Sequence, residues 1–274
     1  MKLQEKIATL KNRLQAMESV AVAYSGGVDS TFLLKVASDV LQNNVIAVTA
    51  QSSTYPGREF REASAFAKAA GIRHIVIQSE ELDIEGFTDN PLDRCYLCKR
   101  ELFSKVREVA RENGIKHVVD GSNVDDLADY RPGMRAVREM GVACPLEEAG
   151  LGKEDIRKAS REMGLPTWDK PALACLSSRF PYGQKITAEK LRVIDAAEQF
   201  LLDLGFRQVR VRHHGDLARI EVSPEERSKF FDAALMDVVY ARFKEAGFAY
   251  VSLDLKGYRT GSMNEVIKTT VATE

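Results

Sequence analysis

The chain has 274 residues, enough for one large domain or two medium ones with a substantial core. Its 39 basic and 40 acidic residues give a net charge of −1, so no overall field attracts it to nucleic acid or to a membrane. No apolar run approaches the ~20 residues of a membrane helix, and the charged first residues are unlike a signal peptide. Four cysteines are too few for a disulfide scaffold, which favours a reducing, cytoplasmic location.

The first part of the chain alternates between two patterns. Apolar runs predict buried strands at 20–24, 45–50, 74–78, 117–120 and 142–145. Helices are expected at about 29–41, 58–70, 99–113 and 153–163. Buried strands that alternate with helices indicate an α/β fold: a parallel five-stranded sheet with helices on both faces and ligands at the carboxyl ends of its strands.

The pattern changes after Gly164. Residues 165–184 contain three prolines and are expected to form an ordered linker. Beyond it, helices near 187–204 and 225–246 and strands at 207–213, 217–222 and 249–255 indicate a smaller α+β domain. The expected organisation is therefore 1–164, 165–184 and 185–274.

A glycine turn joins the first predicted strand to the first predicted helix. The sequence there is Ser-Gly-Gly-x-Asp-Ser, and a helix N-terminus after such a turn offers N–H groups and a positive dipole end to an anion. It lacks the Gly-Lys-Ser/Thr ending of the phosphate loop of kinases and GTPases. It resembles the PP-loop of the ATP pyrophosphatases (adenine nucleotide alpha hydrolase-like), which grip the β,γ-pyrophosphate of ATP and release AMP. That resemblance implies ATP-binding residues Tyr24, Ser25, Gly26, Gly27, Asp29, Ser30 and Thr49.

A polar loop follows the fourth predicted strand, from Asp120 to Asp126. It resembles the second nucleotide loop of PP-loop enzymes, which would place Gly121 and Asn123 at the nucleotide. Magnesium prefers carboxylate and phosphate oxygens, so Asp29 and Asp125, or its neighbour Asp126, are candidate ligands. The alternative is a strand-to-helix loop with an Asx turn.

Two of the cysteines, Cys95 and Cys98, form a C-x-x-C pair at the start of a predicted helix. The spacing fits a redox disulfide, half of a zinc site or two ligands of an iron–sulfur cluster, and by itself it does not choose among them. Cys144 lies in an apolar run and is assigned to packing.

Cys175 begins the segment Cys-Leu-Ser-Ser-Arg-Phe-Pro-Tyr-Gly. With the PP-loop and the Asp-Tyr-Arg-Pro-Gly segment at 129–133, this resembles the ATP-dependent sulfur transferases that build the nickel-pincer nucleotide cofactor (the LarE family). The resemblance extends through 209–212, 217–221 and 253–259, and so covers nearly the whole chain. It implies catalytic roles for Cys175 and Arg179.

Relatives with only this cysteine give up its sulfur and are left with dehydroalanine. The additional Cys95 and Cys98 make this chain similar to the three-cysteine branch, whose members bind a [4Fe-4S] cluster. Three cysteine ligands for four irons leave one iron open, and that iron can bind an extra sulfide. In this arrangement Cys175 is the third ligand of the cluster.

Arg210 and Arg212 are two residues apart and therefore share one face of a predicted strand. Without the resemblance, this pattern would indicate a strand face exposed to solvent. The resemblance implies that they bind the phosphate of the substrate nucleotide, for which the guanidinium fork is suited, and that Arg131 also contacts substrate.

The implied reaction activates a carboxylate, which is by itself a poor electrophile. AMP transfer from ATP gives an acyl adenylate and pyrophosphate, and a sulfide or the Cys175 thiolate then expels AMP. The family's substrate is pyridinium-3,5-biscarboxylic acid mononucleotide, and two rounds give the bisthiocarboxylic acid. The resemblance also implies ATP, Mg²⁺ and a [4Fe-4S] cluster as cofactors, a sulfide source as partner, and a homohexamer built as a trimer of dimers.

The alternative function is that of a PP-loop tRNA thiolation enzyme with a three-cysteine cluster. Such an enzyme needs a basic surface or an RNA-binding module, and a net charge of −1 counts against it.

Overall fold

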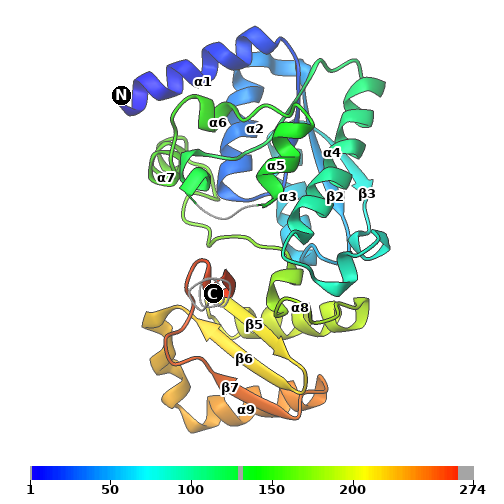
Figure 1. Ribbon diagram of the computed structural model, residues 1–274. Helices are drawn as coiled ribbons and strands as arrows, with labels where there is room; N and C mark the ends of the chain where they lie inside the picture. The colour runs from blue at the N-terminus through cyan, green and yellow to red at the C-terminus, as the bar shows by residue number, and fades with distance from the viewer. Residues whose placement is uncertain (1, 129–131, 265–274) are drawn as a thin grey trace. The chain divides into compact units, whose positions relative to one another are not determined.

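The computed structural model describes residues 2–128 and 132–264, and the chain divides into two compact units (Figure 1). The first unit comprises Met1–Phe87 and Leu92–Leu173, and the second comprises Thr88–Pro91 and Ala174–Glu274. The division falls after Leu173, inside the linker expected at 165–184.

A parallel sheet forms the centre of the first unit, with strand order β3-β2-β1-β4. Its strands are β1 (Val20–Ala23), β2 (Val45–Gln51), β3 (Arg73–Gln78) and β4 (His117–Val119). Valine, isoleucine and alanine fill β1 and most of β2, as expected for strands that are buried on both faces.

The fifth predicted strand, at 142–145, is wrong. Only one residue of this segment joins the sheet, through a parallel bridge between Val119 and Ala143. Its hydrogen bonds run from Ala143 N to Val118 O (3.1 Å) and from Asp120 N to Ala143 O (2.9 Å). Pro145, two residues later, has no N–H for a ladder and begins a helix instead. In the described residues the sheet therefore has four strands where the sequence predicted five.

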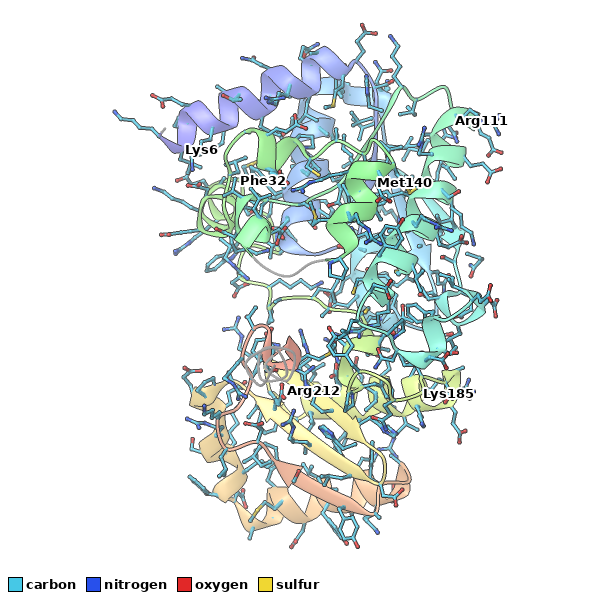
Figure 2. The ribbon with its side chains drawn as sticks, viewed as in Figure 1. Lys6, Phe32, Arg111, Met140, Lys185 and Arg212 are labelled. Carbon is cyan, nitrogen blue, oxygen red and sulfur yellow. The ribbon has the colours of Figure 1, made fainter. Side chains whose placement is uncertain are left out.

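Helices cover both faces of this sheet. They are α1 (Leu3–Met17), α2 (Val28–Leu41), α3 (Gly57–Ala69), α4 (Arg94–Glu112), α5 (Pro132–Glu139), α6 (Pro145–Glu148) and α7 (Lys153–Glu162). Because strand side chains alternate, Val20 and Val22 pack with α1 and α2, while Ala21 packs with Val106 and Ala110 of α4. Figure 1 shows α2, α6 and α7 on one side and α4 and α5 on the other, and Phe32 of α2 (Figure 2) is fully buried.

The second unit is a smaller α+β fold. It contains α8 (Ala188–Asp203), β5 (Val209–His214), β6 (Leu217–Val222), α9 (Ala233–Glu245) and β7 (Tyr250–Leu253). Strands β5 and β6 form an antiparallel hairpin, and β7 pairs with β6 in parallel. The Asn90 side chain donates to Phe180 O (3.1 Å) and Pro181 O (2.7 Å), which ties segment 88–91 to this unit.

The helix predicted near 225–246 is two elements. Pro224–Phe231 (η6) is a 3-10 helix, and α9 starts only after Asp232, whose side chain accepts a hydrogen bond from Ala234 N (2.9 Å) as a new N-cap. The other short 3-10 helices are η1 (Gln42–Asn44), η2 (Glu81–Asp83), η3 (Phe87–Asp89), η4 (Val124–Ala128), η5 (Leu176–Arg179) and η7 (Ser262–Asn264). Among the described helices, none has the length and apolar character to cross a membrane.

Candidate functional site

The loop between β1 and α2 is held by side chains from three other parts of the chain. Residues 24–27 follow β1 at the carboxyl edge of the sheet and lead into the N-terminus of α2, where the first amide groups have no intrahelical acceptor. Three consecutive loop carbonyls each accept a side-chain hydrogen bond, so these carbonyls are already paired within the protein. The bonds are Thr49 Oγ1 to Tyr24 O (2.7 Å), Tyr55 OH to Ser25 O (2.7 Å) and Lys170 Nζ to Gly26 O (3.3 Å).

The two serines of the loop motif lie side by side. Ser25 N donates to Ser30 Oγ (3.3 Å), and the two hydroxyl oxygens are 3.1 Å apart. Ser30 is buried and Ser25 is exposed, so the pair connects the helix start to the surface of the loop. A loop of this kind at a helix N-terminus is a general arrangement for binding an anion.

The glycines of this region differ in why they are needed. Gly26 has φ +67°, and a Cβ built on it would lie 2.8 Å from the Cβ of Ala63 in α3. Gly121, after β4, would place a Cβ 3.0 Å from the backbone N of Ser30. Gly27 has φ −75°, and its Cβ would meet only Ser25 Oγ at 3.5 Å. Space and conformation therefore demand glycine at 26, whereas a Cβ at 121 would be tightly placed and alanine at 27 is tolerated.

We expect Gly26→Ala to destabilise the protein and Gly27→Ala to leave its stability nearly unchanged. At position 26 the left-handed backbone and the collision with Ala63 each cost about 1–3 kcal/mol. Urea unfolding of the two variants and the wild type measures the difference. Equal stability of the two variants would show that the loop relaxes around position 26.

Asp29, in the first turn of α2, is the central carboxylate of the site. Its Oδ2 forms an ion pair with Lys153 Nζ, and its Oδ1 is buried with no hydrogen-bond partner among the described residues. Burial raises the pKa of Asp29, and the nearby Lys153 ammonium opposes that rise. An acidic oxygen left without a partner suits a cation ligand.

The second polar loop brings Asp125 to the same lysine. Asp125 Oδ2 accepts from Lys153 N at 2.6 Å, so Lys153 contacts both candidate magnesium carboxylates. Asn123 is buried, and its Oδ1 accepts from Asp125 N (3.0 Å), which is an Asx turn. Within the described residues no group of three or more His, Cys, Asp or Glu side chains is placed to hold a metal. Magnesium commonly uses one or two carboxylates with water and phosphate oxygens.

At the end of β4, Asp120 is paired with Lys99 of α4, with Nζ 2.7 Å from Oδ2. Burial acts to raise the pKa of Asp120, but Lys99 and the hydrogen bonds from Ser122 together hold it below its ordinary value. Asp120 is therefore a charged anchor that fixes the start of the loop containing Gly121.

Cys95 and Cys98 lie in the first turn of α4, three residues apart and so on the same helix face. Cys95 is exposed, and Cys98 Sγ donates to Glu81 Oε1 at 3.7 Å. Cys144 is buried beside Phe103, and burial raises the pKa of its thiol to about 12. The four cysteines, all within the described residues, form no disulfide with one another.

Cys175 lies in the second unit, immediately before η5. Its carbonyl accepts from Ser178 N (3.1 Å), Ser178 Oγ (2.8 Å) and Arg179 Nη1 (3.0 Å). Arg179 is only 2% exposed, and its Nε and Nη2 each donate to Glu198 at 2.8 Å. Arg179 thus holds the turn that carries Cys175 and is itself held by Glu198.

The two strand arginines are also buried. Arg212 (Figure 2) projects from β5 and donates to Ser178 O (2.8 Å) and Glu221 Oε2 (2.7 Å), while its Nε has no partner among the described residues. The Arg210 guanidinium lies 5.2 Å from the centre of the Tyr258 ring. Burial, and then the positive charge of Arg179, lowers the pKa of Arg210 to about 10. The carboxylates of Glu198 and Glu221, which pair with Arg179 and Arg212, offset part of this positive charge.

Sequence reasoning missed four supporting residues: Tyr55, Lys99, Lys153 and Lys170. Lys99 and Lys170 flank the cysteine motifs, but the sequence assigned a role to none of the four, and only the fold shows that they reach the loop residues. Arg131, expected at the substrate, lies outside the described residues, with the rest of 129–131.

Comparisons with known proteins place the chain in a family. The family model for asparagine synthase matches residues 7–93. An uncharacterized protein of Synechocystis is 44% identical over 97% of this chain and 99% of its own length. An uncharacterized protein of Methanocaldococcus jannaschii is 31% identical over 93% of this chain and 98% of its own.

The pyridinium-3,5-bisthiocarboxylic acid mononucleotide synthase of Lactiplantibacillus plantarum is 41% identical to this chain, over 97% of this chain and 96% of its own length. A likeness of this extent covers both units, including the loops around Ser25 and Cys175. The family expected from the sequence is confirmed: the chain belongs to the family of the pyridinium-3,5-bisthiocarboxylic acid mononucleotide synthases.

Proposed function

We propose that this chain is an ATP-dependent sulfur transferase that converts pyridinium-3,5-biscarboxylic acid mononucleotide into the bisthiocarboxylic acid mononucleotide. The observation that carries the proposal is the full-length likeness to a synthase of that product. The loop at residues 24–30, whose carbonyls at 24, 25 and 26 are paired with side chains at the N-terminus of α2, supports the ATP-dependent step. Location in the cytoplasm and assembly as a trimer of dimers belong to the same proposal.

In this proposal ATP binds along the carboxyl edge of the parallel sheet. Its β,γ-pyrophosphate lies against the amide groups at the start of α2, and Asp29 and Asp125 hold the magnesium ion. The proposed nucleotide-binding residues are Tyr24, Ser25, Gly26, Gly27, Asp29, Ser30, Thr49, Gly121 and Asn123. Thr49 acts indirectly, because its hydroxyl is committed to Tyr24 O.

The first step is adenylation. A substrate carboxylate oxygen attacks the α-phosphorus of ATP, the bond to the bridging oxygen breaks, and pyrophosphate leaves into the loop. The product is an acyl adenylate, in which AMP is a far better leaving group than oxide. The amide groups of the loop would stabilise the charge that develops on pyrophosphate, and a magnesium ion held by Asp29 and Asp125 would add positive charge there.

The second step replaces AMP by sulfur. A sulfur nucleophile attacks the acyl carbon and AMP departs, so each thiocarboxylate uses one ATP. Arg210, Arg212 and Arg131 are proposed to hold the phosphate of the substrate mononucleotide. The partnerless Nε of buried Arg212, counted among the described residues, and the burial of Arg210 beside it on β5 support this role.

The residues proposed to hold a [4Fe-4S] cluster are Cys95, Cys98 and Cys175. Thiolates are the usual ligands of such clusters, and the first turn of a helix stabilises the thiolate form. Cys95 and Cys98 share one face at the start of α4, and Cys95 is exposed, so the pair offers two ligands from one side of the helix. When bound, the cluster supplies the sulfide, taken from an external sulfide source.

The overall test is an anaerobic reaction of the purified chain with ATP, Mg²⁺, sulfide and the biscarboxylate mononucleotide. AMP, pyrophosphate and thiocarboxylate are expected in equal amounts. Release of pyrophosphate without substrate dependence would contradict the proposed reaction.

Asp29→Asn is expected to abolish AMP formation while the protein stays folded. The amide keeps the shape of the side chain but removes the charge that binds magnesium. Asp39→Asn, on the same helix and exposed, is the matched control and should retain activity. Normal AMP formation by Asp29→Asn would place the metal elsewhere.

Single serine substitutions at Cys95, Cys98 and Cys175 are expected to remove the brown colour and the iron bound after anaerobic reconstitution. Cys144→Ser should retain both, because that thiol is buried in packing against α4. Iron and sulfide counts with the visible spectrum make the measurement. A colourless wild type, or equal loss in Cys144→Ser, would contradict the assignment and point to zinc at this pair.

A further inference from the structure

Lys153 contacts both carboxylates of the proposed magnesium site. It is the first residue of α7, and its ammonium pairs with Asp29 Oδ2 although 124 positions separate the two residues in the chain. Its backbone N–H donates to Asp125 Oδ2 at 2.6 Å. The side chain alone therefore reaches Asp29, while the main chain fixes Asp125.

The surroundings of Asp29 make this ammonium important. The carboxylate is partly buried, its Oδ1 lacks a partner among the described residues, and Asp126 adds a like charge nearby. Lys153 and, more weakly, Arg157 are the positive charges that favour the ionised form. The Lys153 ammonium thus supplies at Asp29 the positive charge that a metal ion would otherwise supply.

We propose that Lys153 is a placeholder for the metal ion: its ammonium neutralises Asp29 in the nucleotide-free protein and moves to the phosphate oxygens when the metal–ATP complex binds. The inference rests on the proposed function, in which Asp29 is a magnesium ligand. An ammonium and a magnesium ion on one carboxylate would repel each other at short range, so binding of the metal displaces the lysine.

The side chain is able to make this move. It is 41% exposed and lies on a flexible four-carbon stem, unlike the enclosed ion pair of Arg179 with Glu198. The new partner is the pyrophosphate portion of ATP, which lies beside Asp29 if it binds at the N-terminus of α2. Metal without nucleotide offers the ammonium no such partner. The site therefore takes metal together with ATP and resists metal alone.

The test measures Mn²⁺ binding to the full chain without nucleotide, by the loss of the free-ion signal in electron paramagnetic resonance. Lys153→Met should bind Mn²⁺ about tenfold more tightly than the wild type, because the competing cation is gone. Lys153→Arg keeps the charge and should bind like the wild type. Lys158→Met removes an exposed lysine from the same helix and is the matched control for net charge and helix stability.

A second arm measures ATP binding with saturating Mg²⁺ by calorimetry. Lys153→Met should bind ATP about tenfold more weakly, since a charge-assisted phosphate contact is lost. Lys153→Arg should recover most of that loss. A lysine with only a structural role in holding Asp29 would leave ATP affinity unchanged in Lys153→Met.

The outcomes separate the inference from the proposed function beneath it. Adding Asp29→Asn to Lys153→Met should abolish the gain in Mn²⁺ affinity. Unchanged Mn²⁺ affinity in Lys153→Met, with ATP binding intact in the wild type, would overturn the placeholder role alone. A wild type that binds neither ATP nor Mn²⁺ with ATP would overturn the proposed nucleotide site.

Discussion

Replacing Arg179 by methionine should lower the free energy of unfolding by about 3–5 kcal/mol, because the change leaves the carboxylate of Glu198 buried without its partner. Both side chains are almost fully buried, and two parallel bonds of 2.8 Å join them. Glu198 also accepts from Val211 N at 2.9 Å, so the pair connects η5, α8 and β5. Urea unfolding of the full chain, followed by far-ultraviolet circular dichroism, measures the loss.

Two further variants show whether the unpaired charge is the cause. Arg192→Met removes an exposed arginine from α8 and should change stability by less than about 0.5 kcal/mol. The double variant Arg179→Met/Glu198→Leu removes both charges and should recover much of the lost stability. If the double variant is as unstable as the single one, the lost packing of Arg179 is the dominant cost.

The same pair predicts a pH dependence. Burial acts to raise the pKa of Glu198, but Arg179 outweighs it and holds the pKa below the ordinary value of 4.5. A carboxyl with a depressed folded pKa stabilises the protein above its unfolded pKa, and this contribution is lost as the pH falls through the folded value. The difference in the free energy of unfolding between the wild type and Arg179→Met should therefore become smaller when unfolding is measured below pH 4.5.

The sequence predicted the α/β class, the parallel arrangement and the smaller second fold because each depends on local patterns. The apolar runs of β1 and β2 are unambiguous, and the glycine turn after β1 leaves no doubt about where the strand ends. The error at 142–145 came from treating an apolar run as a strand without weighing Pro145 as a helix start. The split of the helix near 225 has a similar origin, in Pro224 and the N-cap Asp232.

The candidate site also contains residues that the sequence could predict and residues that it could not. Its contiguous motifs were readable because neighbouring residues in one loop share one chemistry, as Ser25, Gly26 and Asp29 do. The residues that hold the loop were not readable, because Tyr55 lies 30 positions from Ser25 and Lys170 lies 144 positions from Gly26. Only the folded chain brings such pairs together.

Lys170 contacts the proposed nucleotide loop and lies five residues before Cys175 in the chain. It holds the Gly26 carbonyl and forms ion pairs with Glu59 (2.5 Å) and Glu62 (2.6 Å) of α3. The segment that leads to Cys175 thus begins at the nucleotide loop.

The second prediction with a large expected effect concerns whether Cys175 keeps its sulfur during turnover. With ATP, substrate and excess sulfide under anaerobic conditions, one reconstituted chain is expected to form several thiocarboxylates, and Cys175 should keep its sulfur. The physical reason is the pair Cys95 and Cys98: two thiols on one face of α4 have no part in a route that breaks the Cys175 carbon–sulfur bond. Product counting and intact-protein mass spectrometry after turnover make the measurement.

The variants separate the two routes sharply. Cys95→Ser with Cys98→Ser should limit the yield to at most one sulfur per chain, whereas Cys144→Ser, whose thiol is buried beside Phe103, should behave like the wild type. In the sacrificial route each chain loses the mass of hydrogen sulfide and carries dehydroalanine at position 175, a loss that lies outside the ordinary oxidation of cysteine. Stoichiometric dehydroalanine in fully reconstituted wild type would therefore refute catalytic sulfur transfer and make Cys175 the donor.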